Sequence, residues 1–104
     1  MFEILKDIVF FTIISGRKQK EALLNAVSDH GGRRVSIMYG EGSVKSSSVL
    51  DALGFVPEEQ KVIITCLLPK KKSDEMISVL TEEFDFDKPN TGIAFSVVLD
   101  KLSF

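Results

Sequence analysis

The sequence predicts a ferredoxin-like α+β sandwich, with four strands in one antiparallel sheet and two helices on one of its faces. Apolar and amphipathic segments follow one another as strand, helix, strand, strand, helix, strand. Two strand–helix–strand units with right-handed crossovers produce this arrangement. The length of 104 residues suits one core, so we expect a single domain over residues 1–104.

The first half of the chain supplies two of the strands and one helix. Residues 8–14 are apolar at odd and even positions and rich in β-branched and aromatic residues, which predicts a strand buried on both faces. Residues 17–30 form a predicted helix because apolar side chains recur every three or four positions. The stripe consists of Leu23, Ala26, Val27 and His30. Gly31 and Gly32 end the helix, and the alternation in residues 33–39 predicts a strand with one wetter face.

The second half repeats the pattern. Residues 62–68 form a second doubly apolar strand that Pro69 ends. Ser73 is a candidate N-cap for the helix that follows, with Asp74 and Glu75 favourably placed for its dipole. The apolar stripe of this helix consists of Met76, Ile77, Leu80 and Phe84. Residues 93–99 are the predicted last strand.

The predicted helices cover one face of the sheet, yet three strands are apolar on both faces. An uncovered face of that composition would form a large apolar patch, which soluble monomers seldom expose. We therefore expect another copy of the chain to cover it.

Composition limits the function. The formal net charge of −2 argues against a nucleic-acid partner, which requires a basic surface. Cys66 is the single cysteine, so an internal disulfide and a clustered Cys/His zinc site are excluded. Residues 8–14 are too short to span a membrane and lack the flanks of a signal peptide, so we expect a cytoplasmic protein.

The segment between the second and third strands is unusually long and has a distinctive composition. Glycine and serine open it, an apolar patch occupies its middle, and charged residues close it. Connections longer than about a dozen residues are usually functional or disordered. We interpret residues 43–60 as a loop that binds a partner protein. Its apolar residues are Val49, Leu50, Leu53, Phe55 and Val56.

With these elements in place, the chain resembles the PII family of nitrogen-regulatory signal proteins, and most closely its short PII-like members. The resemblance covers residues 8–99. It depends on the strand order, on Gly40-Glu41-Gly42 opening a long loop, on Lys61 opening the third strand, and on the sequence from Thr91 to Phe95.

The resemblance implies a homotrimer whose sheets line the inside. It also implies adenine nucleotides, ATP or ADP, bound in clefts between subunits, and a long loop that docks on a transporter or an enzyme. Carried over by position, the nucleotide site would contain Gly40, Gly42 and Ser43 at the loop base, Lys61, and Thr91 and Gly92 from the second loop of the neighbouring subunit. Lys101 is the nearby basic candidate towards the C-terminus. Glycines at strand ends let backbone N–H groups approach phosphate oxygens, and lysine supplies a countercharge.

The chain departs from the family at several positions. Val44 stands where the family places a glutamine that helps to hold metal and oxoglutarate, so oxoglutarate is not expected to bind well. Ile93 replaces a lysine that commonly follows the glycine of the second loop. The long loop has no tyrosine, which excludes uridylylation there.

Other functions have weaker support. We find no nucleophile–base pair, phosphate-binding loop or metal-ligand spacing, so an enzyme is not expected. A small-molecule or metal-binding regulatory trimer of the same fold, without nucleotide, remains an alternative. An RNA-binding module shares the strand order, but it needs aromatic residues on the middle strands, and residues 62–68 contain none.

Overall fold

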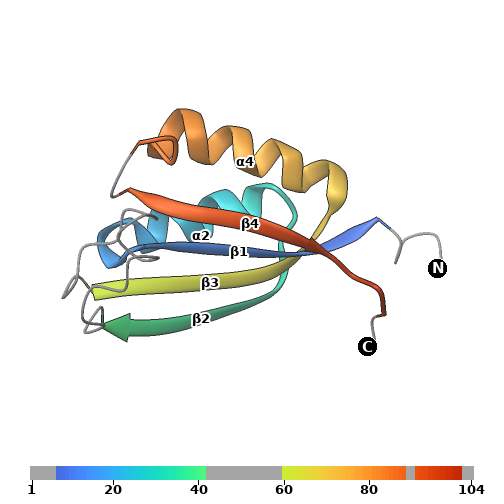
Figure 1. Ribbon diagram of the computed structural model, residues 1–104, viewed down its shortest axis with the longest axis horizontal. Helices are drawn as coiled ribbons and strands as arrows, with labels where there is room; N and C mark the ends of the chain where they lie inside the picture. Colours follow the sequence, from blue (N-terminus) through green and yellow to red (C-terminus); the bar gives the residue numbers. More distant parts are fainter. Residues whose placement is uncertain (1–6, 42–59, 89–90, 102–104) are drawn as a thin grey trace, which may run out of the picture.

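The computed structural model describes residues 7–41, 60–88 and 91–101. Its elements follow the predicted order (Figure 1). They are β1 (Ile8–Gly16), the 3-10 helix η1 (Arg17–Gln19), α2 (Lys20–Asp29), β2 (Arg33–Glu41), β3 (Gln60–Pro69), α4 (Lys70–Phe84) and β4 (Gly92–Val98).

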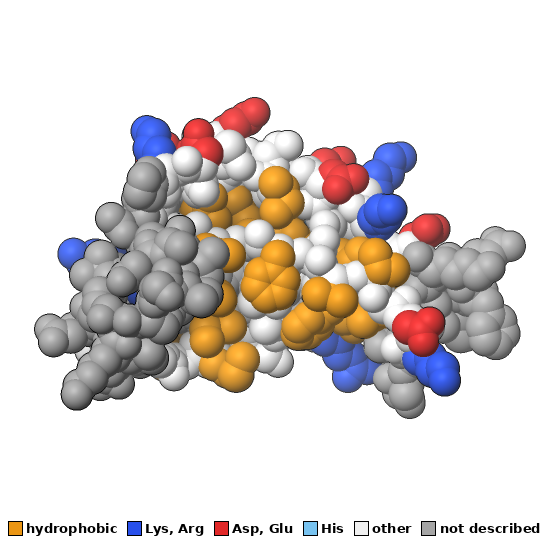
Figure 2. Space-filling model, viewed as in Figure 1, with side chains coloured by type: hydrophobic (Ala, Val, Ile, Leu, Met, Phe, Trp, Pro, Cys, Tyr) orange, Lys and Arg blue, Asp and Glu red, His pale blue; other side chains and the backbone are white. Residues whose placement is uncertain are grey.

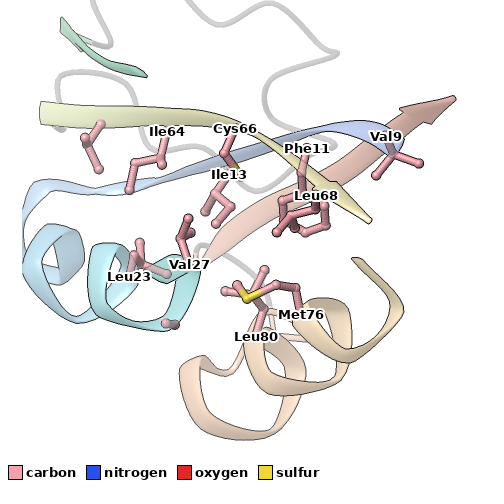
Figure 3. Packing of buried hydrophobic residues seen from close by; sticks show 12 residues of the cluster. Val9, Phe11, Ile13, Leu23, Val27, Ile64, Cys66, Leu68, Met76 and Leu80 are labelled. Carbon is pink, nitrogen blue, oxygen red and sulfur yellow. The ribbon is translucent and has the colours of Figure 1, made fainter. Parts of the chain in front are cut away.

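The strands form one sheet in the order β2-β3-β1-β4, and every neighbouring pair is antiparallel. The doubly apolar strands β1 and β3 occupy its centre, with Ile13 opposite Ile64. Both helices lie on the same side of the sheet (Figures 1 and 3). The predicted ferredoxin-like arrangement is confirmed.

The core lies between the sheet and the helices. Helix α2 contributes Leu23 and Val27, and α4 contributes Met76 and Leu80, all facing the strands (Figure 3). The strand residues of the core alternate along each strand because successive side chains point to opposite faces. They are Val9, Phe11, Ile13, Val62, Ile64, Cys66 and Leu68.

The predicted start of the second helix is wrong. Helix α4 begins at Lys70 directly after Pro69, and Ser73 lies inside the helix with its side chain buried. The Lys70 N–H donates to the carbonyl oxygen of Asp7, so the backbone before β1 satisfies this first helical donor without a serine cap. Ser73 instead shares the buried face of α4 with Met76, three residues later.

Strand β2 differs from its prediction in exposure. Its described side chains are exposed on both faces, because β2 is an edge strand and its register shifts between Arg33 and Ser36. Arg34 there has a positive φ of 55°. The glycine stop of α2 is confirmed at Gly31, whose φ of 80° lies in the left-handed region.

Candidate functional site

One end of the sheet brings several predicted site residues together. In the register of the strands, Lys61 lies opposite Gly40 of β2 on one side and Gly16 of β1 on the other. Gly92 lies opposite Ser15, so the start of β4 reaches the same end. Positions far apart in the sequence thus converge at the base of the long loop.

The other predicted positions are placed differently. Thr91 immediately precedes β4 at this end of the sheet. Lys101 lies beyond Val98, which pairs with Val9, so it is at the opposite end of β4 from Gly92. Gly42, Ser43 and the loop residues Val49, Leu50, Leu53, Phe55 and Val56 lie outside the described residues.

Gly92 has a packing role that the sequence did not indicate. A Cβ atom there would lie 2.4 Å from Cζ of Phe86. The Phe86 ring therefore occupies the space that a side chain at this position would need. It packs against the core and meets Phe84 edge-on, with 6.4 Å between ring centroids.

A group of cationic and aromatic side chains surrounds the loop base. The guanidinium carbon of Arg17 lies 4.7 Å from the ring centroid of Tyr39, a cation–π distance. Lys20 Nζ donates to the Tyr39 hydroxyl at 2.9 Å. This hydrogen bond is the main reason why the pKa of Lys20 is raised, and it keeps the ammonium charged.

Arg17 also connects η1 to the start of β3. Its Nε donates to the carbonyl oxygen of Lys61 at 3.3 Å, and its Nη1 donates to Gln60 Oε1 at 3.4 Å. One guanidinium thus contacts β2, through Tyr39, and β3, the two strands that flank residues 42–59. Sequence reasoning missed these residues. The sequence does contain a signal for them, the basic residues that follow Gly16. Their helical pattern, however, does not indicate that they lie beside the long loop.

The sheet face away from the helices is apolar. Paired residues share a face, so Phe10 and Val97 lie together, as do Ile14 and Ile93. Phe10, Met38, Phe95 and Val97 are 38%, 51%, 44% and 50% exposed, respectively. Hydrophobic side chains gather over the strands in Figure 2, with charged groups towards the margins. The apolar second face predicted from sequence is present, and none of the described elements covers it.

Two further features bear on function. Within residues 7–41, 60–88 and 91–101, no three His, Cys, Asp or Glu side chains lie close enough to hold a metal ion. In the same part of the chain, no helix has the length and hydropathy needed to cross a membrane.

No family model matches the chain, and no curated protein matches it. Solved structures do. CPII from Thiomonas intermedia, bound to ADP, AMP and acetate, aligns with a TM-score of 0.66 at 15% identity, over 86% of this chain and 82% of that one. A protein from Thermus thermophilus, described as PII-like and signalling, aligns with a TM-score of 0.64 at 17% identity, over 86% and 84%.

Arabidopsis thaliana PII bound to citrate aligns with a TM-score of 0.63 at 14% identity, over 90% of this chain and 78% of that one. The chain therefore has the fold of PII-like proteins.

Proposed function

We propose that this protein is a PII-like regulator that binds an adenine nucleotide, ATP or ADP, in clefts between subunits. The observation that supports it best is the convergence of Gly40, Lys61 and Gly92 at one end of a sheet with the PII-like fold. CPII, which shares that fold, has been solved with ADP and AMP.

The chemistry of this end of the sheet suits a phosphate chain. No atom of the described residues lies within 4 Å of a Cβ built on Gly40, so a ligand can approach its backbone closely. Lys61 and Arg17 supply positive charge beside it, and charge-assisted hydrogen bonds to phosphate are the stronger kind. Gly42 and Ser43 would continue the site, which also includes Thr91.

A homotrimer would complete the cleft. The apolar face carrying Phe10, Phe95 and Val97 needs a cover, and another copy of the chain supplies one of matching character. In such an assembly, Lys101 from a neighbouring subunit would contact the nucleotide, because within one chain Lys101 lies at the end of β4 opposite to Gly92.

Regulation would act through residues 43–60. We propose that Val49, Leu50, Leu53 and Phe55 dock on a cytoplasmic target, such as a membrane transporter or an enzyme, since buried apolar anchors dominate the binding energy of such contacts. Nitrogen status is the signal that the family resemblance suggests. Binding of oxoglutarate has little support, because Val44 stands where the family places a glutamine.

Nucleotide binding can be tested by thermal unfolding with and without ATP or ADP. A ligand at one hundred times its Kd stabilises the native state by about 2.7 kcal/mol, so the Tm should rise. Lys61→Ala should reduce that rise. Lys71→Ala is the matched control, since Lys71 is exposed on α4, which begins at the opposite end of β3. No Tm shift at millimolar nucleotide would remove the nucleotide site from the proposal.

A second candidate function is a regulatory trimer of this fold that responds to a small molecule without nucleotide. It is favoured by a pocket beside η1 whose lining includes the polar residues Ser15, Gln19 and Asp85.

A further inference from the structure

A pocket of about 610 Å³ opens at the same end of the molecule, where β1 passes into η1. The end of α4 and the turn before β4 form its other side. Its volume falls within the range of pockets that bind small molecules, roughly 300–1,000 Å³.

Two side-chain oxygens at this pocket have no hydrogen-bond partner among the described residues. They are Ser15 Oγ and Gln19 Oε1, and both atoms are buried. Ser15 is 1% exposed, and both residues line the pocket. Buried polar atoms in native proteins are nearly always paired with protein, water or a ligand. Two buried and unpaired oxygen atoms at one pocket therefore indicate a missing polar partner.

The chemistry of that partner follows from the lining. Gln19 Oε1 can only accept a hydrogen bond, so the partner must carry an N–H or O–H donor. Arg17 and Lys18 line one part of the pocket and favour an anion, whereas Asp85 lines another part and disfavours a polyanion. A compact molecule with one donor and one or two carboxylates satisfies both conditions.

We propose that this pocket binds a small hydroxy- or amino-carboxylate. Its carboxylate lies towards Arg17, and its hydroxyl or ammonium group donates to Gln19 and meets Ser15.

The pocket and the proposed nucleotide site share Thr91 and Arg17 but use different faces of the sheet. Ser15 pairs with Val62 and therefore shares the helix-covered face. Lys61, the next residue along β3, directs its side chain to the opposite face. The proposal does not depend on nucleotide binding, and its test uses no nucleotide.

The experiment compares ligands that differ only in the donor. Binding is measured by calorimetry, and the site is located from backbone amide shifts of the ¹⁵N-labelled full chain. The pairs are lactate against pyruvate and 2-hydroxyglutarate against 2-oxoglutarate, with glutamate as the amino form. The hydroxy and amino acids should bind roughly tenfold or more tightly than the keto acids, because only they satisfy Gln19. The amides of residues 15–19 should shift.

Ser15→Ala and Gln19→Leu remove the two acceptors one at a time. Each should reduce the preference for hydroxy and amino acids over keto acids, while the ligand-free protein should melt at the same or a higher temperature, because a buried unpaired group has been removed. Ser28→Ala is the control, since Ser28 is exposed in the last turn of α2.

Three results would overturn the proposal. They are equal affinity for the hydroxy and keto members of a pair, unchanged preference in both variants, and no binding of any member at millimolar concentration. The last result would assign the unpaired oxygens to water.

Discussion

Replacing Gly92 by alanine tests whether this glycine serves packing or ligand approach. The new Cβ would lie 2.4, 2.7 and 2.8 Å from three carbons of the Phe86 ring, so the ring must move. The backbone itself tolerates alanine, because Gly92 is in a strand and has no positive φ. Overpacking of this kind typically costs about 1–3 kcal/mol of unfolding free energy.

The same substitution should raise the unfolding free energy, and not lower it, when Phe86 is replaced by alanine. The obstructing ring is then absent, and replacing glycine by alanine at a compatible position stabilises by about 0.4–1 kcal/mol through the unfolded chain. The coupling between the two sites is the difference between these two effects of opposite sign, about 1.4–4 kcal/mol. Urea unfolding followed by circular dichroism measures it for wild type, both single variants and the double variant. All are compared at one protein concentration, because assembly contributes to stability.

Equal destabilisation by Gly92→Ala in both backgrounds would refute the packing explanation. The double variant also separates the two roles of the glycine. If it folds and is still stabilised by nucleotide, a glycine is needed at position 92 only to leave room for the Phe86 ring. If it folds and has lost that stabilisation, Gly92 is needed by the ligand.

Three other predictions concern assembly, the thiol and the loop. Phe95→Asp should convert a trimer to monomers in sedimentation experiments. Ile77→Asp should not, because Ile77 is a 39% exposed residue of α4 and lies away from the apolar sheet face. Burial raises the pKa of Cys66 to about 11 from 9.0, so the wild type should lose stability between these pH values, where the unfolded thiol ionises first. The loss should exceed that of Cys66→Ala by about 1.4 kcal/mol per pKa unit of difference. Leu50→Ser with Leu53→Ser should leave Tm and assembly unchanged but abolish binding to the target protein; a large fall in Tm would show that the loop is structural.

The fold was predictable because its signals are local. The doubly apolar runs of β1 and β3 identify the central strands, and the three- and four-residue spacing of Leu23 and Val27 identifies a helix. The start of α4 was not predictable in this way. Ser73 has the chemistry of a cap, but the Lys70 N–H already donates to the carbonyl oxygen of Asp7, a contact between distant parts of the chain. Tertiary contacts here override a local preference.

The site was predictable only where a glycine or a lysine marks it. Gly40, Lys61 and Gly92 do lie at one end of the sheet, although their role toward a nucleotide stays a prediction. Arg17 was missed because its partner Lys61 is 44 residues away and accepts through a backbone carbonyl, which leaves no trace in residue type. The orphan oxygens of Ser15 and Gln19 could not be inferred either, since an unpaired polar atom is visible only in three dimensions.

Arg17 links the two proposed sites physically. Arg17 lines the pocket, and its guanidinium binds the Lys61 carbonyl, Gln60 and the Tyr39 ring at the stems of the long loop. A carboxylate in the pocket would compete for the same N–H groups, so its binding must weaken the contacts that hold these stems. Linkage is reciprocal. A ligand that strengthens the contacts of Arg17 with the loop stems must lower the affinity for the carboxylate by the same factor by which the carboxylate lowers the affinity for that ligand. Tyr39→Leu, which removes the ring from the guanidinium but leaves the pocket lining intact, should therefore increase carboxylate affinity, and a decrease would place Arg17 outside the coupling.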